Sequence, residues 1–331
     1  MILYLIGISY KEAPLSLRES IYRARKEIIE FWQKPGRSSA ALFTCNRVEL
    51  YGASLDIFSA AKTIESFQIR FPWISERSYV KFGDREVVEH ALRLACGLES
   101  QVIGEEEILE QLNSWIRQAS FPLALRRIWN DILGKVETIR IKSGLKEVKA
   151  NIATIIFKDL DKPKEIVIVG TGKIARVFSK NKPDGINLNF VARKKHKQAR
   201  QLANQSGGRA ILLDDLEQLL LSADVLISAT SSPHYVLKKE HFLNIVKKRN
   251  KPIYLYDLAA PRDIEPDVGN IPGIFLQNLD DLNIVFEQHK RSLNSYIKKA
   301  ELLVQDHYKE NDDVYSYQNR GAAEPVGVKT G

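Results

Sequence analysis

The chain has 331 residues, of which 44% are hydrophobic and 27% charged, and its formal net charge is +8. This composition is typical of a globular protein of about two domains and excludes a disordered chain. No apolar run reaches the ~18 residues of a membrane helix. The apolar start, MILYLIGISY, has no basic region and no cleavage site, so we expect a first strand rather than a signal peptide.

Cysteine content and charge limit the compartment and the partners. Two cysteines in a chain of this length argue against a disulfide framework and favour the reducing cytoplasm. The positive charge permits a polyanionic partner such as RNA, although dispersed lysines that aid solubility would give the same charge. The six histidines are scattered and the cysteines lie far apart, so we predict no metal site.

Residues 1–143 mix strand-like and helical patterns and are predicted to form a compact α/β domain. ILYLIGI and AALFT are short apolar runs, whereas EHALRLA and the stretch 125–139 repeat at helical spacing. The apolar stripe of the second helix consists of Leu125, Ile128, Trp129, Ile132, Leu133, Val136 and Ile139.

The pattern changes after about residue 144 to alternating strands and helices. EIVIVG, NLNFVA, ADVLISA and IYLYDLA are predicted strands separated by helical stretches, which indicates a parallel, Rossmann-type doubly wound domain over 144–279. Residues 280–310 then predict one long amphipathic helix without an internal break. The polar tail 311–331 contains Gly and Pro, and we expect it to be disordered.

VIVGTGKIA carries the G-x-G-x-x-A form of the dinucleotide-binding motif between a strand and a helix. Gly170 permits the tight turn, Gly172 lets a pyrophosphate approach the backbone, and Ala175 allows close packing of helix on strand. The helix N-terminus adds N–H donors for the phosphates. The predicted cofactor contacts in this segment are Gly170, Thr171, Gly172, Lys173, Ile174 and Ala175.

The end of the next strand indicates which dinucleotide is bound. NAD sites carry an acidic residue about 20 residues past the glycines, but FVARKKHK places Arg193 and Lys194 there. Arginine can pair with the 2′-phosphate of NADP(H), whereas an acidic residue would repel it. We therefore predict NADPH as the cofactor; the alternative is a solvated basic start to the next helix.

Cys45 lies in LFTCNRVELY, a polar turn between two apolar runs. A nearby guanidinium, here that of Arg47, favours the reactive thiolate, so Cys45 is either a nucleophile or a small packing residue. Cys96 lies in an apolar helical pattern and is interpreted as packing. A cysteine nucleophile combined with a reduced dinucleotide suggests acyl reduction through a thioester. The sequence has no Walker A motif, so the acyl group must arrive already activated.

These motifs resemble the glutamyl-tRNA reductase family. The resemblance runs to about residue 310 and rests on GISYKEAPLSLRE (7–19), TCNRVELY (44–51), GLESQVIGEEEILEQ (97–111), GTGKIA (170–175) and APRDIEPDVG (260–269). It implies an N-terminal α/β domain of ferredoxin-like type that is catalytic, the NADP-binding domain and the long helix. It also implies glutamyl-tRNA(Glu) as substrate and Cys45 as the residue that carries the glutamyl thioester.

The resemblance implies roles for further residues of the N-terminal domain. His90 matches a histidine that is important for activity in the family; read alone, a histidine in an apolar helix is more often structural. Arg47 suits the side-chain carboxylate of the glutamyl group, and Glu49 orients Arg47. The acidic residues of GEEE suit the ammonium group of the substrate; the alternative is a solvated start of a helix. The implied substrate contacts are Thr44, Asn46, Arg47, Glu49, Ser100, Glu105, Glu106, Glu107 and Gln111.

The sequence departs from the family pattern at three places. Phe43 stands where the family usually has Ser, and GEEE replaces GEPQ. The sequence given also ends where related enzymes continue into a helical dimerisation domain, so we expect a monomer or a weak dimer. The product could pass to glutamate-1-semialdehyde aminotransferase. The competing interpretations are an NADP-dependent reductase of another activated acyl group and a non-catalytic, tRNA-binding regulator.

Overall fold

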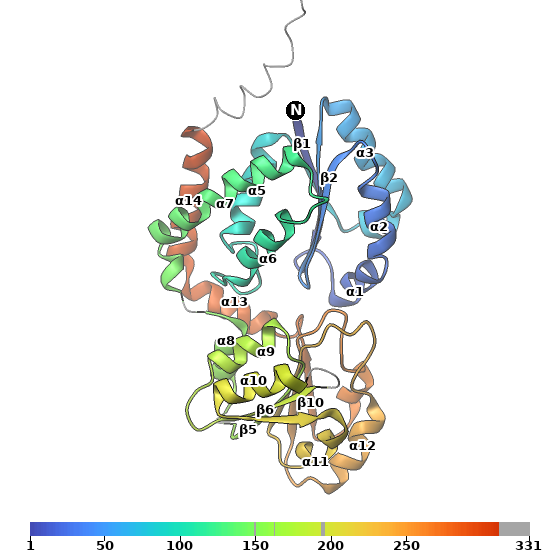
Figure 1. Ribbon diagram of the computed structural model, residues 1–331, viewed down its shortest axis with the longest axis vertical. Helices are drawn as coiled ribbons and strands as arrows, with labels where there is room; N and C mark the ends of the chain where they lie inside the picture. The colour runs from blue at the N-terminus through green and yellow to red at the C-terminus, as the bar shows by residue number, and fades with distance from the viewer. Residues whose placement is uncertain (149, 162, 193–195, 311–331) are drawn as a thin grey trace, which may run out of the picture. The chain divides into compact units, whose positions relative to one another are not determined.

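The computed structural model describes residues 1–148, 150–161, 163–192 and 196–310. These form two compact units, which are described separately (Figure 1). The first unit comprises the described residues within 1–12, 26–149 and 293–331, and the second those within 13–25 and 150–292. The predicted tail 311–331 lies outside the described residues.

A four-stranded antiparallel sheet forms the centre of the first unit. Its strands are β1 (Ile2–Ser9), β2 (Ser38–Phe43), β3 (Arg47–Ser54) and β4 (Tyr79–Phe82), in the order β2-β3-β1-β4. Helices precede β2 and β4, which gives the βαββαβ connectivity of the ferredoxin-like fold. The fold class predicted for this part of the chain is confirmed.

Helices cover both faces of this sheet. α3 packs against β1 and β3, while α5 and α7 contact the same sheet through β1, β2 and β3. Strand β1 is therefore buried on both sides, which explains its continuous apolar run. The helices of this unit are α2 (Arg25–Trp32), α3 (Ile57–Arg70), α4 (Pro72–Ser75), α5 (Asp84–Ala95), α6 (Glu107–Ile116), α7 (Leu123–Ser143), the 3₁₀ turn η1 (Leu145–Glu147) and α14 (Asn294–Glu310).

The second unit contains a six-stranded parallel sheet in the order β10-β9-β8-β5-β6-β7. This is the strand order of dinucleotide-binding folds, so the predicted Rossmann-type fold is confirmed. The prediction named four of the strands and missed β7 and β10, which lie at the two edges, where partial exposure weakens the apolar pattern. The strands are β5 (Glu165–Val169), β6 (Asn187–Ala192), β7 (Arg209–Leu212), β8 (Val225–Ser228), β9 (Ile253–Asp257) and β10 (Ile274–Asn278).

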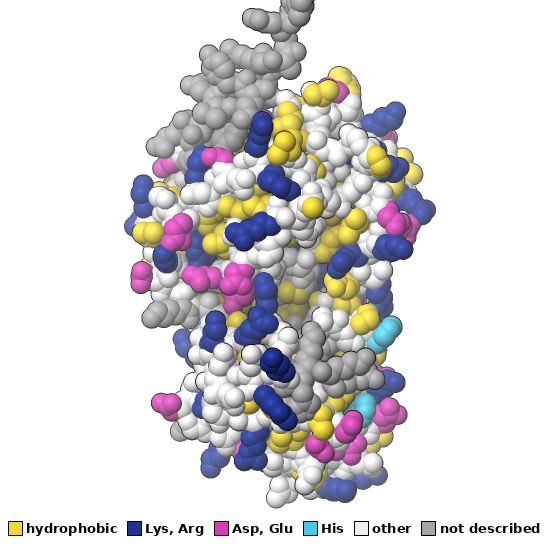
Figure 2. All heavy atoms as spheres, viewed as in Figure 1, with side chains coloured by type: hydrophobic (Ala, Val, Ile, Leu, Met, Phe, Trp, Pro, Cys, Tyr) yellow, Lys and Arg dark blue, Asp and Glu magenta, His cyan; other side chains and the backbone are white. Residues whose placement is uncertain are grey.

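Crossover helices connect these strands. They are α9 (Lys173–Lys180), α10 (His196–Ser206), α11 (Leu216–Leu220) and α12 (Lys239–Lys248), with the 3₁₀ turns η2 (Leu213–Asp215) and η3 (Pro266–Asn270). Helix α8 (Ile152–Asp159) precedes β5, and α13 (Asn283–Ser292) follows β10. None of the helices in the described part of the chain is long and apolar enough to cross a membrane. On the face drawn in Figure 2, Lys and Arg side chains are dispersed among apolar and acidic ones.

Helix α1 (Leu15–Arg23) belongs to the second unit although it lies within the range predicted for the N-terminal domain. Buried Arg18 pairs with Asp280. Buried Glu19 accepts hydrogen bonds from the backbone N–H of Arg262, at 2.6 Å, and from its guanidinium, at 2.9 and 3.0 Å. Two distant sequence motifs, LSLRE and APRDIEP, are therefore joined by the Glu19–Arg262 ion pair.

The predicted single helix over 280–310 is wrong at Leu293, where α13 ends and α14 begins. The Ser292 hydroxyl donates to the carbonyl of His289, at 2.6 Å, and such local bonding competes with helix continuation. Leu293 is buried in the core of the first unit. The two helices serve separate cores, because α13 packs on α8 whereas α14 packs on α5 and α7.

The Glu19–Arg262 pair should contribute measurably to stability. Glu19→Ala leaves the partly buried Arg262 guanidinium and a backbone N–H unpaired, and should lower the free energy of unfolding by about 2–3 kcal/mol. The matched control is Glu27→Ala, which removes an exposed arginine pair, with Arg70, and should cost under about 1 kcal/mol. Denaturant unfolding measures both, and equal losses would contradict the assigned role of Glu19.

Candidate active site

Cys45 lies in the tight turn that joins β2 to β3, and its side chain is exposed. The hydroxyl oxygen of Thr44 accepts the N–H groups of Asn46 and Arg47, at 3.2 and 3.1 Å, and the N–H of Thr44 donates to the Arg47 carbonyl, at 2.9 Å. The N–H of Tyr10 donates to the Asn46 carbonyl, at 2.8 Å. The polar residues of TCNR therefore fix the turn backbone while the thiol remains accessible.

Arg47 connects this turn to the segment 97–105. Its guanidinium is 3% exposed and donates to the Glu49 carboxylate, at 2.8 Å, and to the backbone carbonyl of Glu99. Both terminal nitrogens are thus engaged within the protein. The predicted pairing of Arg47 with a substrate carboxylate stays a prediction. The Tyr10 hydroxyl also donates to this segment, at the Ser100 carbonyl, at 3.3 Å.

A fully buried carboxylate, that of Glu49, is the centre of the site. It accepts hydrogen bonds from the hydroxyls of Tyr51, at 2.5 Å, and Tyr79, at 2.7 Å. Its Oε1 lies 3.0 Å from Nε2 of His90. Burial alone would raise the pKa of Glu49, but interactions with His90 and Arg47 lower it below its ordinary range. Burial and the Glu49 charge in turn raise the pKa of Tyr79, which keeps its hydroxyl a donor.

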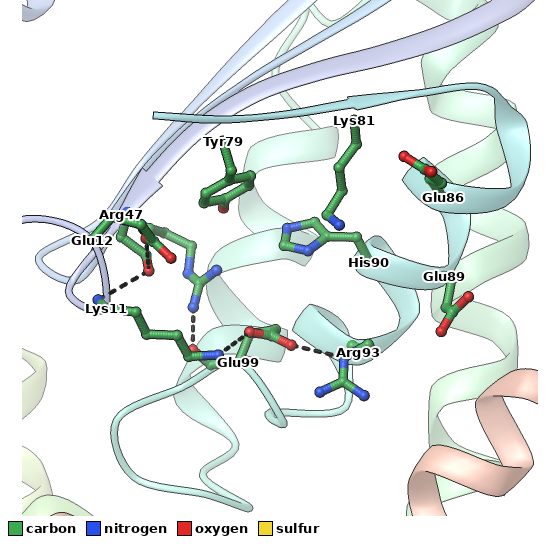
Figure 3. A pocket seen from close by; sticks show the side chains of 11 residues that line it. Lys11, Glu12, Arg47, Tyr79, Lys81, Glu86, Glu89, His90, Arg93 and Glu99 are labelled. Carbon is green, nitrogen blue, oxygen red and sulfur yellow. Dashed lines mark hydrogen bonds and ion pairs between the residues drawn. The ribbon is translucent and has the colours of Figure 1, made fainter. Parts of the chain in front are cut away.

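A cavity of about 520 Å³ opens beside this network (Figure 3). Lys81 projects into it from β4 and His90 from α5. Its charged lining carries both signs, which suits a ligand with a positive and a negative group. The lining residues are Ser9, Lys11, Glu12, Arg47, Tyr79, Lys81, Glu86, Glu89, His90, Arg93 and Glu99.

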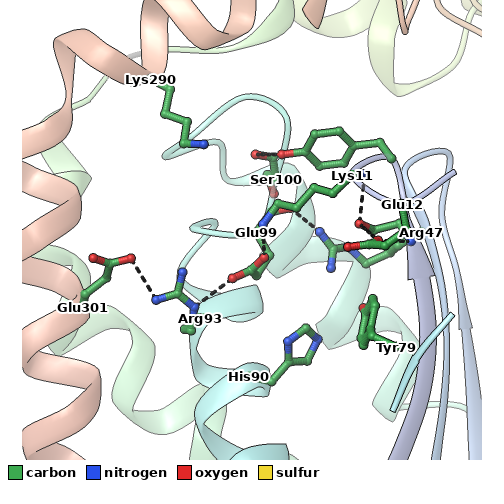
Figure 4. A network of polar contacts seen from close by, with 12 residues as sticks. Lys11, Glu12, Arg47, Tyr79, His90, Arg93, Glu99, Ser100, Lys290 and Glu301 are labelled. Atoms are coloured by element: carbon green, nitrogen blue, oxygen red, sulfur yellow. Dashed lines mark hydrogen bonds and ion pairs between the residues drawn. The ribbon is translucent and has the colours of Figure 1, made fainter. Parts of the chain in front are cut away.

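Glu99 joins side chains that line one wall of this cavity (Figure 4). It pairs with Lys11 and, at 2.8 Å, with Arg93, which extends the network to Glu301 of α14, at 2.9 Å. Burial would raise the pKa of Glu99, but Lys11 and Arg93 lower it to about 2. The carboxylate therefore stays charged at neutral pH. Sequence reasoning did not single out Lys11, Tyr79, Arg93 or Glu99.

Arg140 holds both ends of the segment 96–105 by hydrogen bonds. This buried side chain of α7 donates to three backbone carbonyls, those of Cys96, Gly104 and Glu105, at 2.7 to 3.1 Å. Cys96 is fully buried, and burial raises the pKa of its thiol to about 12. A thiol in this state is a packing group, unlike that of Cys45.

The remaining predicted substrate residues lie along this segment and on α6. Burial and the nearby Glu107 raise the pKa of Glu105 to about 8, and the Ser100 hydroxyl is hydrogen-bonded to it. Glu106 is exposed, whereas Glu107 and Gln111 are half-buried on α6. None of these three lines the cavity described above. Their roles stay predictions.

The glycine segment lies between β5 and α9 in the second unit, as predicted. Gly170 has φ +117°, and a Cβ there would lie 2.6 Å from the Ala229 carbonyl, so only glycine fits. Gly172 faces open space and begins α9 without a side-chain cap. Thr171 donates to Gln198, at 3.1 Å, and Ala175 is fully buried.

This geometry fits a dinucleotide, whose pyrophosphate would lie over Gly172 and the start of α9. Lys173 is exposed there and Ile174 is half-buried. Arg193 and Lys194, the residues predicted to select NADPH, lie outside the described residues. Within the described residues, no group of three or more side chains could hold a metal ion.

Comparisons with known proteins identify the family. The protein-family model for the N-terminal domain of glutamyl-tRNA(Glu) reductase matches residues 6–143. The family model for shikimate/quinate 5-dehydrogenase matches residues 151–285. Glutamyl-tRNA reductase of Ectopseudomonas mendocina is 33% identical over 322 residues, covering 90% of this chain and 75% of that protein. The chain belongs to the glutamyl-tRNA reductase family.

A second relative and a solved structure are also similar to this chain. The protein from Thermus thermophilus is 31% identical over 320 residues, covering 92% of this chain and 78% of that protein. The solved structure of glutamyl-tRNA reductase from Methanopyrus kandleri is 26% identical, with a TM-score of 0.49, and covers 96% of this chain and 81% of that one. The family resemblance inferred from the sequence motifs is confirmed by the relatives over 30% identical.

The raised pKa of Glu105 makes a pH-dependent contribution to stability. Because its folded-state pKa of about 8 exceeds its ordinary value of 4.5, Glu105 stabilises the fold while protonated. That contribution is fully present below about pH 4.5 and is lost as the pH rises toward 8. Relative to Glu105→Gln, the wild type should therefore lose stability between about pH 5 and about pH 8. Denaturant unfolding at both pH values measures this, with exposed Glu65→Gln as control; parallel curves for wild type and Glu105→Gln would contradict it.

Proposed function

We propose that this chain is an NADPH-dependent glutamyl-tRNA reductase that converts glutamyl-tRNA(Glu) into glutamate-1-semialdehyde. This reaction is the first step of the five-carbon route to tetrapyrroles. The observation that carries the proposal is the exposed Cys45 thiol, held in a hydrogen-bonded turn next to the cavity-lining Arg47. The dinucleotide fold of the second unit supplies the other half of the chemistry.

Cys45 performs the first step. Its thiolate attacks the ester carbonyl carbon that links glutamate to the tRNA, and a C–S bond forms. The C–O bond to the terminal ribose then breaks, and the departing oxygen takes up a proton. The turn positions the sulfur, because Thr44 and the N–H of Tyr10 hold the backbone on both sides of it.

The thioester then becomes an aldehyde. A thioester carbonyl is weakly stabilised by resonance, so it accepts hydride more readily than the ester that a serine would form. When bound, NADPH supplies that hydride to the carbonyl carbon. The C–S bond breaks afterwards, which releases the aldehyde and regenerates the Cys45 thiolate.

The mixed charge of the cavity supports a glutamyl substrate. Lys81 can attract the side-chain carboxylate, whereas Glu86 and Glu89 can attract the ammonium group. Arg47 has both terminal nitrogens engaged by Glu49 and the Glu99 carbonyl, so we assign it the role of fixing the TCNR turn against the segment 97–105. Transfer of the product to an aminotransferase and a monomeric or weakly dimeric state remain predictions.

The nucleophile can be tested by kinetics. Cys45→Ser should abolish semialdehyde formation, because a serine ester is a poor hydride acceptor and the hydroxyl a poor nucleophile. Cys96→Ser is the matched control and should retain most of the activity. The assay follows semialdehyde formation from glutamyl-tRNA and NADPH. Full activity of Cys45→Ser would end the thioester proposal.

The cofactor preference can be tested in the same assay. Arg193→Glu should raise the KM for NADPH at least about tenfold, since a carboxylate repels the 2′-phosphate, and should change NADH turnover much less. The control is Arg200→Glu, an equal charge reversal at an exposed position of α10. Equal kinetics of the wild type with both cofactors would show that the basic cluster does not select NADPH.

A further inference from the structure

The second unit contains a cavity of about 470 Å³ that the proposed chemistry does not use. Its walls come from the end of α1, from the loop after β8 and from the loop after β9. Both loops leave the carboxyl ends of parallel strands, the same edge of the sheet that carries the glycine segment. Besides two prolines, it is lined by Tyr22, Arg23, His234, Tyr235, Lys238 and Arg262. We call it the aromatic–basic cavity.

The charges of this cavity favour an anion. Three of the lining side chains are cationic and none is acidic. Arg262 is neutralised by Glu19, but Arg23 and Lys238 are exposed and have no ion pair within the described part of the chain. Two lysine or arginine side chains that converge on one cavity suit a phosphate group, which each can contact directly.

The uncharged lining favours a flat ring beside that anion. Tyr22, His234 and Tyr235 contribute aromatic rings to the lining, and the guanidinium carbon of Arg25 lies 5.6 Å from the centre of the Tyr22 ring. Aromatic rings interleaved with cations are the surface on which single-stranded nucleic acids bind, because each base stacks and each phosphate pairs. A lipid would require a continuous apolar surface, which these residues do not provide.

The walls are held in place before any ligand binds. The buried Asp263 carboxylate accepts the Thr230 N–H, at 2.7 Å, and its backbone carbonyl accepts the N–H groups of Val236 and Leu237, at 2.7 and 3.0 Å. Glu19 fixes Arg262 to α1 through three hydrogen bonds. A site built this rigidly loses little conformational entropy when it binds.

We propose that the aromatic–basic cavity binds the unpaired 3′ end of the substrate tRNA, with a base between the aromatic rings and a phosphate on Arg23 and Lys238. This inference rests on the proposed function, which makes tRNA the substrate. The bound dinucleotide is the other source of a base with a phosphate. No lining residue belongs to Gly170–Ala175, where the dinucleotide pyrophosphate would lie, so the RNA end is favoured.

The test compares the binding of two uncharged tRNA(Glu) transcripts to the full chain by fluorescence anisotropy at fixed salt. One transcript is complete and the other lacks the unpaired 3′ end. R23E/K238E should weaken binding of the complete tRNA at least about tenfold and affect the shortened tRNA much less. Tyr235→Ala should weaken it about tenfold, whereas Tyr235→Phe, which keeps the ring, should bind like the wild type. Exposed Lys247→Glu on α12 is the matched charge control.

Four results would overturn the inference. Equal losses for the two transcripts would mean that the cations act elsewhere on the tRNA. A loss of NADPH affinity with unchanged tRNA affinity would assign the cavity to the cofactor. If R23E/K238E and Tyr235→Ala bind tRNA as tightly as the wild type does, this inference fails. The proposed function still stands in that case, provided that the wild type makes semialdehyde. A wild type that binds no tRNA would contradict both.

Discussion

The site of this protein depends on one buried carboxylate, that of Glu49. It is fully excluded from solvent and has four partners, which are Arg47, Tyr51, Tyr79 and His90. These partners come from β3, β4 and α5, so a single charge holds three elements in one arrangement. Loss of that charge would leave a buried guanidinium unpaired, at a cost of about 3 kcal/mol or more.

The consequences of this arrangement extend to the thiol. One terminal nitrogen of the Arg47 guanidinium donates to Glu49 and the other donates to the Glu99 carbonyl. Arg47 thereby joins the TCNR turn to the segment 97–105. Cys45 lies two residues before Arg47 and is exposed, while Cys96, next to that segment in the chain, is fully buried. The two cysteines differ in accessibility because Cys45 lies in the exposed turn between β2 and β3, whereas Cys96 packs in the hydrophobic core of the first unit.

Local patterns were sufficient to predict much of the fold. The helix over 125–139, the four central strands of the second unit and the glycine segment each have a strong short-range signal, from periodicity or from a motif that only glycine satisfies. The position of Cys45 in a turn between two strands also followed from its polar neighbours. Edge strands β7 and β10 were missed because partial exposure removes the apolar run that marks a strand.

Long-range partners could not be predicted from local patterns. Tyr79 and Arg93 have no motif of their own, and only the folded chain brings them to Glu49 and Glu99. Helix α1 joins the second unit through two ion pairs, Glu19 with Arg262 and Arg18 with Asp280. The partners are separated by 243 and 262 positions in the sequence. The break at Leu293 arises because its neighbours pack into two different cores. These are tertiary contacts, and tertiary contacts have little effect on the periodicity of the sequence.

The most direct test of the account is to trap the acyl group on the enzyme. Full-length protein is incubated with glutamyl-tRNA in the absence of any reduced dinucleotide, quenched in acid and mapped by peptide mass spectrometry. The account predicts one glutamyl adduct, on the peptide that contains Cys45, and its disappearance when NADPH is added before the quench. Turnover with NADPH but no adduct on Cys45, or an adduct on Cys96 instead, would contradict it.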